Sequence, residues 1–265
     1  MGIDYRLSFR KLATGALCSV AASLVICVTS GLYFGFSKVT QTHCRSYEFL
    51  PSLSAVLDYN GYHRIITQIP ILIHCIFHSV TILLAYRHHQ SNSTRISLLA
   101  IRSYSPWAGL LNLFIAVVDA VSLGGLLTLA FITSSLYFAV HKNGMIVFML
   151  ATTLHMGLGS YQQWSHSSFS SKAPGQKEQQ QQQHIQLQVA KSLRTKLFCC
   201  AISVLCVFVG GALYQNHNAY CKAYSYSMFA VCEYVAVSNA LVFQHSKVCD
   251  LPRMHLSLSY SDSIT

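Results

Sequence analysis

The chain has 265 residues, of which 52% are hydrophobic and only 10% carry a full charge. A soluble domain has about 25% charged residues, so eight acidic residues are too few to coat a soluble globule of this length. The formal charge of +10 comes from Lys and Arg residues that cluster between apolar runs. That pattern favours membrane orientation and attraction to anionic head groups, and no base-reading motif is present. We therefore expect a membrane protein that has no nucleic-acid partner.

Six apolar segments are long enough to cross a bilayer, whose hydrocarbon core of about 30 Å needs roughly 20 residues at about 1.5 Å each. The first follows the basic residues 1–11, and its uncharged run is too long for a cleavable signal peptide, so we interpret it as a retained helix. The third begins near Pro106-Trp107, because Pro is favoured in the first turn of a helix. The predicted spans cover residues 12–36, 65–86, 107–131, 144–164, 197–214 and 223–245. The predicted fold class is therefore all-α, a polytopic bundle of six transmembrane helices.

The distribution of positive charge predicts the orientation of these helices. If both termini are cytoplasmic, 13 of the 18 Lys and Arg residues lie on the cytoplasmic side, which fits the positive-inside rule. The five on the opposite side are Lys38, Arg45, Arg64, Lys142 and Lys222. We therefore place both termini in the cytoplasm.

The connections between the spans differ in composition. Residues 165–191 contain a Ser-rich stretch and the Gln run 179–183 without apolar periodicity, which predicts a disordered cytoplasmic linker. The first outer loop, residues 37–64, is instead rich in aromatic and aliphatic side chains. We expect this loop to fold back onto the membrane surface or onto the bundle. The membrane domain is predicted to cover residues 1–250, and residues 251–265 to form a cytoplasmic tail.

Two of the ten cysteines, Cys44 and Cys221, fall in loops assigned to the non-cytoplasmic side. If that side is the oxidising lumen of the secretory pathway, a disulfide between them would tie the first outer loop to the third. Separation in sequence does not say whether the two sulfurs reach each other, so two unpaired thiols are the alternative. No CxxC or Cys/His finger spacing is present, so we predict no structural zinc site and assign no residue as a metal ligand.

Five ionisable residues lie inside the predicted spans: His74, His78, Asp119, His155 and Glu233. Such groups are costly in lipid, so they should face the interior of the bundle. At about 1.5 Å per residue, His74, His155 and Glu233 lie roughly 14–16 Å from the outer ends of their helices, and Asp119 lies roughly 18 Å from the opposite end of its own. His78 is one turn from His74 on the same face. We therefore expect all five to meet near the midplane.

Three interpretations of these buried groups stay open. They form an acid–base or metal-binding site in a lipid-accessible cavity, or they bind substrate, or they pair by hydrogen bonds that lock the helices together. In the last case Asp119 or Glu233 would accept a hydrogen bond from a histidine.

A second group of candidate residues lies at the outer ends of the helices. Cations, amides and aromatic rings at this level suit the head group of a lipid that carries phosphate and sugar, although the same residues suit ordinary interface anchors. The candidate substrate-binding residues are His43, Lys142, His217, Asn218 and Tyr220.

Three segments carry a family resemblance: THC…YEFLPSLSAV at residues 42–56, HKNGMIVF…LHM at residues 141–156 and HNAYC…MFAVCEYVAV at residues 217–237. They resemble the six-helix membrane family of post-GPI-attachment-to-proteins factors, which also includes FGF-receptor-activating-protein-like and autophagy-modulator (DRAM-like) proteins. The resemblance covers nearly the whole chain, from Arg6 to about His245. It implies lipid remodelling of glycosylphosphatidylinositol (GPI) anchors in the Golgi membrane, with the endoplasmic reticulum membrane as a further location.

In that role the protein would be required to reacylate lyso-GPI with a saturated fatty acid, and its partners would be membrane lipids and GPI-anchored proteins. The resemblance leaves two forms of this role open. The protein is an acyltransferase that uses acyl-CoA or a phospholipid as donor, or it is an accessory factor to a separate acyltransferase. A signalling or autophagy-modulating role is a third hypothesis. If the protein is an enzyme, His155 or His74 would act as base on the lyso-lipid hydroxyl. Glu233 or Asp119 would orient that histidine.

Overall fold

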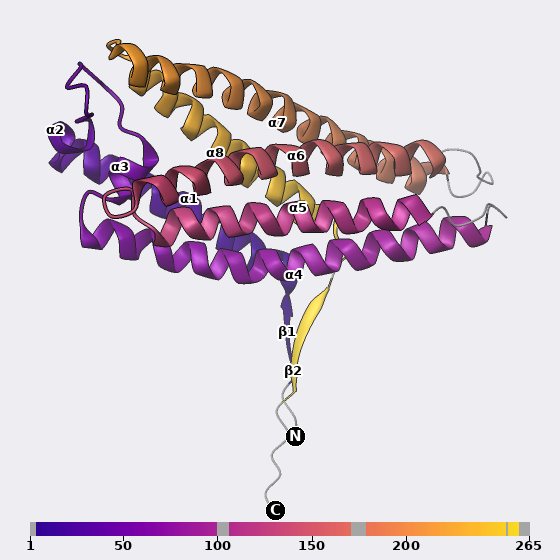
Figure 1. Cartoon of the computed structure of the whole chain (residues 1–265). Helices are drawn as coiled ribbons and strands as arrows, with labels where there is room; N and C mark the ends of the chain where they lie inside the picture. Colours follow the sequence, from indigo (N-terminus) through magenta and orange to yellow (C-terminus); the bar gives the residue numbers. More distant parts are fainter. Residues whose placement is uncertain (1–3, 100–105, 171–178, 253, 260–265) are drawn as a thin grey trace, which may run out of the picture.

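The computed structural model describes the chain except residues 1–3, 100–105, 171–178, 253 and 260–265. In the described part, six helices are long and apolar enough to cross a membrane. They form one elongated bundle (Figure 1) and comprise α1 (Phe9–Phe34), α4 (Gly61–Leu99), α5 (Pro106–Phe131), α6 (Phe138–Ser170), α7 (Gln179–Tyr220) and α8 (Ser225–Asp250). The predicted all-α fold class with six spanning helices is confirmed.

Four short elements lie outside the spans. The helices α2 (Phe36–Val39) and α3 (Leu53–Leu57) belong to the first outer loop. We call this end of the bundle, where a disulfide joins Cys44 and Cys221, the disulfide end. The strands β1 (Asp4–Ser8) and β2 (His255–Ser259) pair antiparallel, with Ser8 opposite His255. Together the strands project from the bundle as a two-stranded ribbon (Figure 1). The predicted C-terminal tail therefore contains a strand that pairs with the N-terminus.

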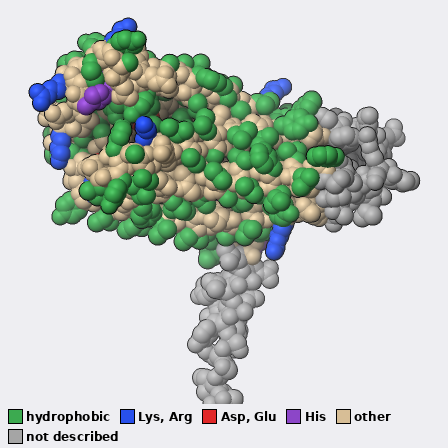
Figure 2. All heavy atoms as spheres, viewed as in Figure 1, with side chains coloured by type: hydrophobic (Ala, Val, Ile, Leu, Met, Phe, Trp, Pro, Cys, Tyr) green, Lys and Arg blue, Asp and Glu red, His purple; other side chains and the backbone are tan. Residues whose placement is uncertain are grey.

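The surface of the bundle fits a lipid environment. Figure 2 shows apolar side chains spread over the visible face, and the Lys and Arg side chains that it draws lie at the disulfide end and at a few places further along the described part of the bundle. Within the bundle, α5 packs closely on α6 because small residues lie at their contact. A Cβ atom on Gly125 would lie only 2.7 Å from the backbone nitrogen of Phe148, so a larger residue would force the helices apart.

The predicted linker is largely helical where the structure describes it. Helix α6 continues to Ser170 and α7 begins at Gln179, while residues 171–178 lie outside the described residues. The polar composition suggested disorder, but Gln is a good helix former and simply extends a helix that is already nucleated by its apolar span. The two helices therefore reach further than the apolar runs alone indicate.

The first outer loop folds onto the start of α8, as expected. Glu48 accepts hydrogen bonds at 2.8 Å from both the backbone nitrogen and the hydroxyl of Ser227. The same hydroxyl accepts from the backbone nitrogen of Phe49 at 2.8 Å, and the Tyr234 hydroxyl donates to the Pro51 carbonyl at 3.1 Å. These bonds satisfy loop backbone groups inside the protein, where water is scarce.

The orientation in the membrane stays a prediction, with the disulfide end in the lumen. An epitope tag at either terminus should then bind antibody in cells whose plasma membrane alone is permeabilised with digitonin. The native sequon Asn92-Ser93-Thr94 should stay unglycosylated, because it lies on the cytoplasmic side. A shift in mobility on treatment with a glycosidase that depends on Asn92 would contradict this orientation.

Candidate functional site

A buried carboxylate joins three other helices near the middle of the bundle. Asp119 of α5 is 1% exposed, and its Oδ1 accepts a hydrogen bond from Nε2 of His78 on α4 at 2.9 Å. Its Oδ2 lies 3.3 Å from Nε2 of His155 on α6 and accepts from the Lys247 ammonium of α8. Nζ of Lys247 also lies 3.3 Å from the same His155 nitrogen. We call these residues, together with His74, the Asp119 cluster.

The fifth member, His74, contacts the carboxylate through a second imidazole. Its Nε2 lies 3.4 Å from Nδ1 of His78. Because a carboxylate can only accept, the proton of a neutral His78 lies on Nε2, and its Nδ1 is then the acceptor for His74. The order Asp119, His78, His74 is therefore a chain in which each group fixes the orientation of the next.

Lys247 is a member that sequence reasoning missed. It was placed beyond the end of the sixth span, whereas α8 continues to Asp250. A lysine near a helix end can extend its apolar stem along the bundle while its ammonium reaches a distant partner. The available signal was Asp119 itself, since a buried carboxylate needs a cation to offset its desolvation.

Glu233 does not join the cluster. Its Oε2 accepts a hydrogen bond at 2.9 Å from the backbone nitrogen of Leu53, the first residue of α3. Equal depth along a helix does not specify the direction in which a side chain points, and α3 reaches down to meet this carboxylate. Four of the five predicted residues therefore meet, and the fifth anchors the outer loop.

An apolar cavity of about 110 Å³ lies between the cluster and the outer loop. Aliphatic side chains form most of its wall. Its polar lining residues are Ser54, His74, His78, Ser122, His141, Thr152, Glu233 and Gln244. Two of the four proposed catalytic residues, His74 and Glu233, thus face the cavity. Asp119 and His155 do not line it; Asp119 contacts the lining residue His78, and His155 contacts Asp119.

A second cavity, the polar pocket, lies at the disulfide end and has a volume of about 310 Å³. Three of the predicted substrate-binding residues line it, namely His43, Lys142 and Asn218. The other two do not. His217 is fully buried with its ring 5.3 Å from that of His43, and Tyr220 is 79% exposed outside the pocket. Of the five predicted residues, three therefore line the pocket, one is buried behind His43 and one lies on the surface.

The two cavities have residues in common. Ser54, next to the start of α3, and His141, in the first turn of α6, line both the polar pocket and the apolar cavity. A molecule with a polar head and an apolar chain could therefore lie across this boundary, with one part in each cavity.

Cys44 and Cys221 form a disulfide with a Cα–Cα distance of 5.3 Å, which ties the first outer loop to the end of α7. The ring of His43 lies beside them, and one ligand atom from each of the three residues falls within 4.8 Å of the others. That spacing would suit a metal, although none was predicted. Thiolates rather than disulfide sulfurs are metal ligands, so the bonded pair is a structural link.

Residues 8–254 match the model of the Frag1/DRAM/Sfk1/Cwh43P N-terminal domain family. The chain belongs to this family. Its relatives include "Post-GPI attachment to proteins factor 2" of Drosophila melanogaster, 26% identical over 93% of this chain and 87% of that protein. "Acyltransferase PGAP2" of Xenopus tropicalis is 25% identical over 96% of this chain and 92% of its own length. No solved structure matches the chain.

The family match confirms the resemblance found in the three sequence segments. It spans all six helices and the first outer loop, so the Asp119 cluster and both cavities lie within the family domain.

Substitution of Asp119 by Asn should strongly destabilise the bundle, because the Lys247 ammonium is then buried without a counter-charge. Breaking a buried ion pair from one side costs about 3–5 kcal/mol. We expect the unfolding temperature of the purified protein in detergent to fall accordingly. The double variant Asp119→Asn/Lys247→Met should recover much of the loss, because it removes the orphaned charge and keeps the apolar stem. Additive losses in the double variant would contradict the pairing.

Proposed function

We propose that this protein remodels the lipid of GPI anchors in the Golgi membrane by transferring a saturated fatty acid to lyso-GPI. The names of its relatives, a post-GPI attachment factor and an acyltransferase, support this class of function. The observation that carries the proposal is the pair of adjoining cavities inside a six-helix membrane bundle, one polar and one apolar.

The polar pocket suits the head group of such a lipid. The Lys142 ammonium can pair with a phosphate oxygen, and a charge-assisted bond of this kind is stronger than a neutral one. The Asn218 amide and the His43 imidazole offer donors and acceptors for sugar hydroxyls. The anchor of a GPI-linked protein, with its phosphate and sugars, presents these groups together.

The apolar cavity suits an acyl chain. Its aliphatic wall includes Val20 and Leu24 of α1, Ile71 of α4 and Leu126 of α5. These side chains are as apolar as lipid tails, so an acyl chain can move into the cavity from the bilayer without exposing methylene groups to polar surroundings. At its deeper side the Asp119 cluster holds His74 and His78 in fixed orientations. The cluster thereby gives the cavity a rigid polar wall.

An acyltransferase needs a donor, and acyl-CoA or a phospholipid would supply the chain. The client proteins are GPI-anchored proteins that have lost one fatty acid. The same two cavities would serve an accessory factor that presents the lyso-lipid to a separate acyltransferase, so activity of the purified protein decides between these roles.

Purified protein in lipid nanodiscs should transfer a labelled acyl group to lyso-GPI when acyl-CoA or a labelled phospholipid is supplied. Product is measured by mass spectrometry of the lipid. Folded protein that binds lyso-GPI without transfer would make it an accessory factor. Normal anchor lipids in cells that lack the protein would refute the remodelling role and favour a signalling or autophagy function.

A bulkier side chain in the apolar cavity should obstruct binding of the acyl chain of lyso-GPI. Val237 of α8 lines this cavity, whereas Val235 of the same helix is exposed to the surroundings. Val237→Phe should raise the KM for lyso-GPI by about tenfold or more, since a few methylene groups in an apolar pocket have effects of this size. Val235→Phe is the matched control and should leave KM unchanged. Equal KM values for the two variants would contradict chain binding in this cavity.

A further inference from the structure

His141 is a buried imidazole with one nitrogen bonded and one nitrogen open. It is 7% exposed, and its Nδ1 lies 2.6 Å from the backbone carbonyl oxygen of Ile132. A carbonyl oxygen can only accept, so Nδ1 carries the proton and donates it. In the neutral ring, Nε2 then has a free lone pair. That nitrogen is buried and has no hydrogen-bond partner among the residues that the structure describes.

A buried acceptor without a partner is costly, so its presence calls for an explanation. His141 lines both the polar pocket and the apolar cavity, and a bound molecule that lies across the boundary would pass beside it. A hydroxyl group of that molecule would satisfy the open nitrogen. Lys142, the next residue, lines the polar pocket as well, where a phosphate would lie.

The position of His141 along the bundle matches the free hydroxyl of a lyso-lipid. It lies in the first turn of α6, three residues after Phe138, or roughly 5 Å from the disulfide end of that helix. His74 is 13 residues into α4, or roughly 20 Å from the same end. The glycerol of a lipid lies directly below its head group, so its hydroxyl falls at the level of His141 and well above His74.

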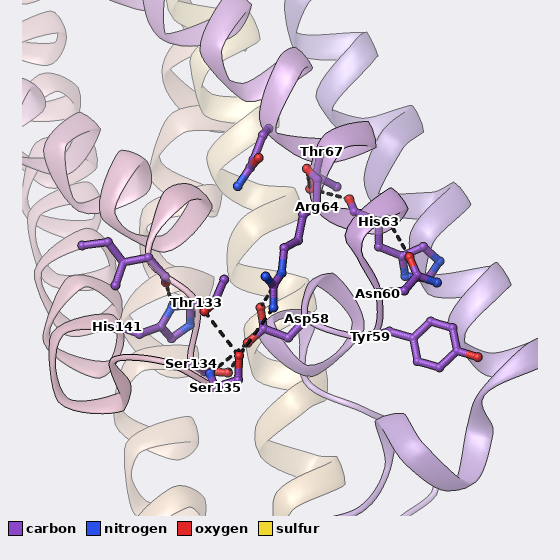
Figure 3. A network of polar contacts seen from close by, with 12 residues as sticks. Asp58, Tyr59, Asn60, His63, Arg64, Thr67, Thr133, Ser134, Ser135 and His141 are labelled. Atoms are coloured by element: carbon purple, nitrogen blue, oxygen red, sulfur yellow. Dashed lines mark hydrogen bonds and ion pairs between the residues drawn. The ribbon is translucent and has the colours of Figure 1, made fainter.

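The surrounding network holds the ring in place (Figure 3). The Asp58 carboxylate accepts hydrogen bonds from the Ser134 hydroxyl at 2.7 Å and from the Ser135 backbone nitrogen at 3.1 Å. It also pairs with Arg64 at 3.5 Å. These contacts fix the short segment between α5 and α6 that carries the Ile132 carbonyl. Asp58 is thus a positioning residue for His141.

We propose that His141 is the catalytic base of acyl transfer. The acceptor lipid lies with its head group in the polar pocket and a chain in the apolar cavity, so its free hydroxyl contacts Nε2 of His141. This inference rests on the proposed acyltransferase function and replaces His74 and His155, the bases predicted from sequence.

Acyl transfer proceeds through one tetrahedral intermediate. The hydroxyl oxygen forms a bond to the carbonyl carbon of an acyl thioester or phospholipid ester, while its proton moves to Nε2 of His141. The tetrahedral intermediate then breaks the bond to the leaving sulfur or oxygen, which takes the proton back from the imidazolium. The ring ends neutral, the chain ends as an ester of the acceptor, and a thiol or lysophospholipid leaves. The bond to Ile132 keeps the ring in the correct tautomer throughout.

His141→Ala should lower kcat for acyl transfer by about a hundredfold or more, the usual contribution of a general base. Imidazole added to the assay should restore part of the rate in the space that the variant opens. Pyrazole has the same ring size and also carries one donor and one acceptor nitrogen, but it is far less basic, and it should restore none. The control is His245→Ala, since His245 is an exposed imidazole on α8 away from both cavities.

If His141→Ala does not fold, His141→Asn serves instead, because its amide can keep the donor to the Ile132 carbonyl while it lacks the base. This variant should still bind lyso-GPI, with an affinity loss of about tenfold at most from the missing contact to the hydroxyl, and should turn over at most about a hundredth as fast. Wild-type kcat in either folded variant, or equal rescue by pyrazole, would overturn the role of His141 and leave the proposed function intact. A wild-type protein that transfers no acyl group would overturn both.

Discussion

The carboxylate of Asp119 is the interaction around which the bundle is organised. In a bilayer there is little hydrophobic drive for helices to associate, so polar contacts and close packing must hold them together. Asp119 of α5 meets side chains of α4, α6 and α8 at a single point. A charge buried so deeply is tolerated only when its partners surround it, so these four helices have one arrangement that satisfies them all. That arrangement defines the deep wall of the apolar cavity.

The opposite side of the cavity depends on acidic residues that accept hydrogen bonds from backbone nitrogens. Glu48 and Glu233 accept hydrogen bonds from the start of α8 and of α3, respectively, and so fasten the first outer loop over the bundle. The disulfide holds the same loop to the end of α7. The cavity therefore lies between the charged cluster on one side and the first outer loop on the other. This explains why Glu233 lines the cavity without joining the Asp119 cluster.

The sequence predicted what depends on length, composition and depth. Apolar runs gave six helices, and counting along them brought His74, His78, Asp119 and His155 to one level, where they do meet. The prediction was wrong where the direction of a side chain decides its partner. Glu233 has the depth of the Asp119 cluster, but its carboxylate points toward α3. The prediction also missed Lys247. The apolar run of the sixth span ends before this residue, whereas the helix continues to Asp250. The β1–β2 ribbon pairs the two ends of the chain, and no local pattern predicts a partner about 250 residues away.

His141 shows why a site at a boundary is hard to find from sequence. By composition it belongs to a polar segment before a span, where an imidazole is an ordinary interface residue. Its chemistry comes from a carbonyl nine residues earlier, which fixes the tautomer, and from two cavities that meet beside its open nitrogen. Acyl transfer to a lipid needs such a boundary, since the hydroxyl that reacts lies between a hydrated head group and a dry chain. A base placed there lies beside the hydroxyl that reacts, whereas a histidine deeper in the bundle would meet only the methylene groups of the chain.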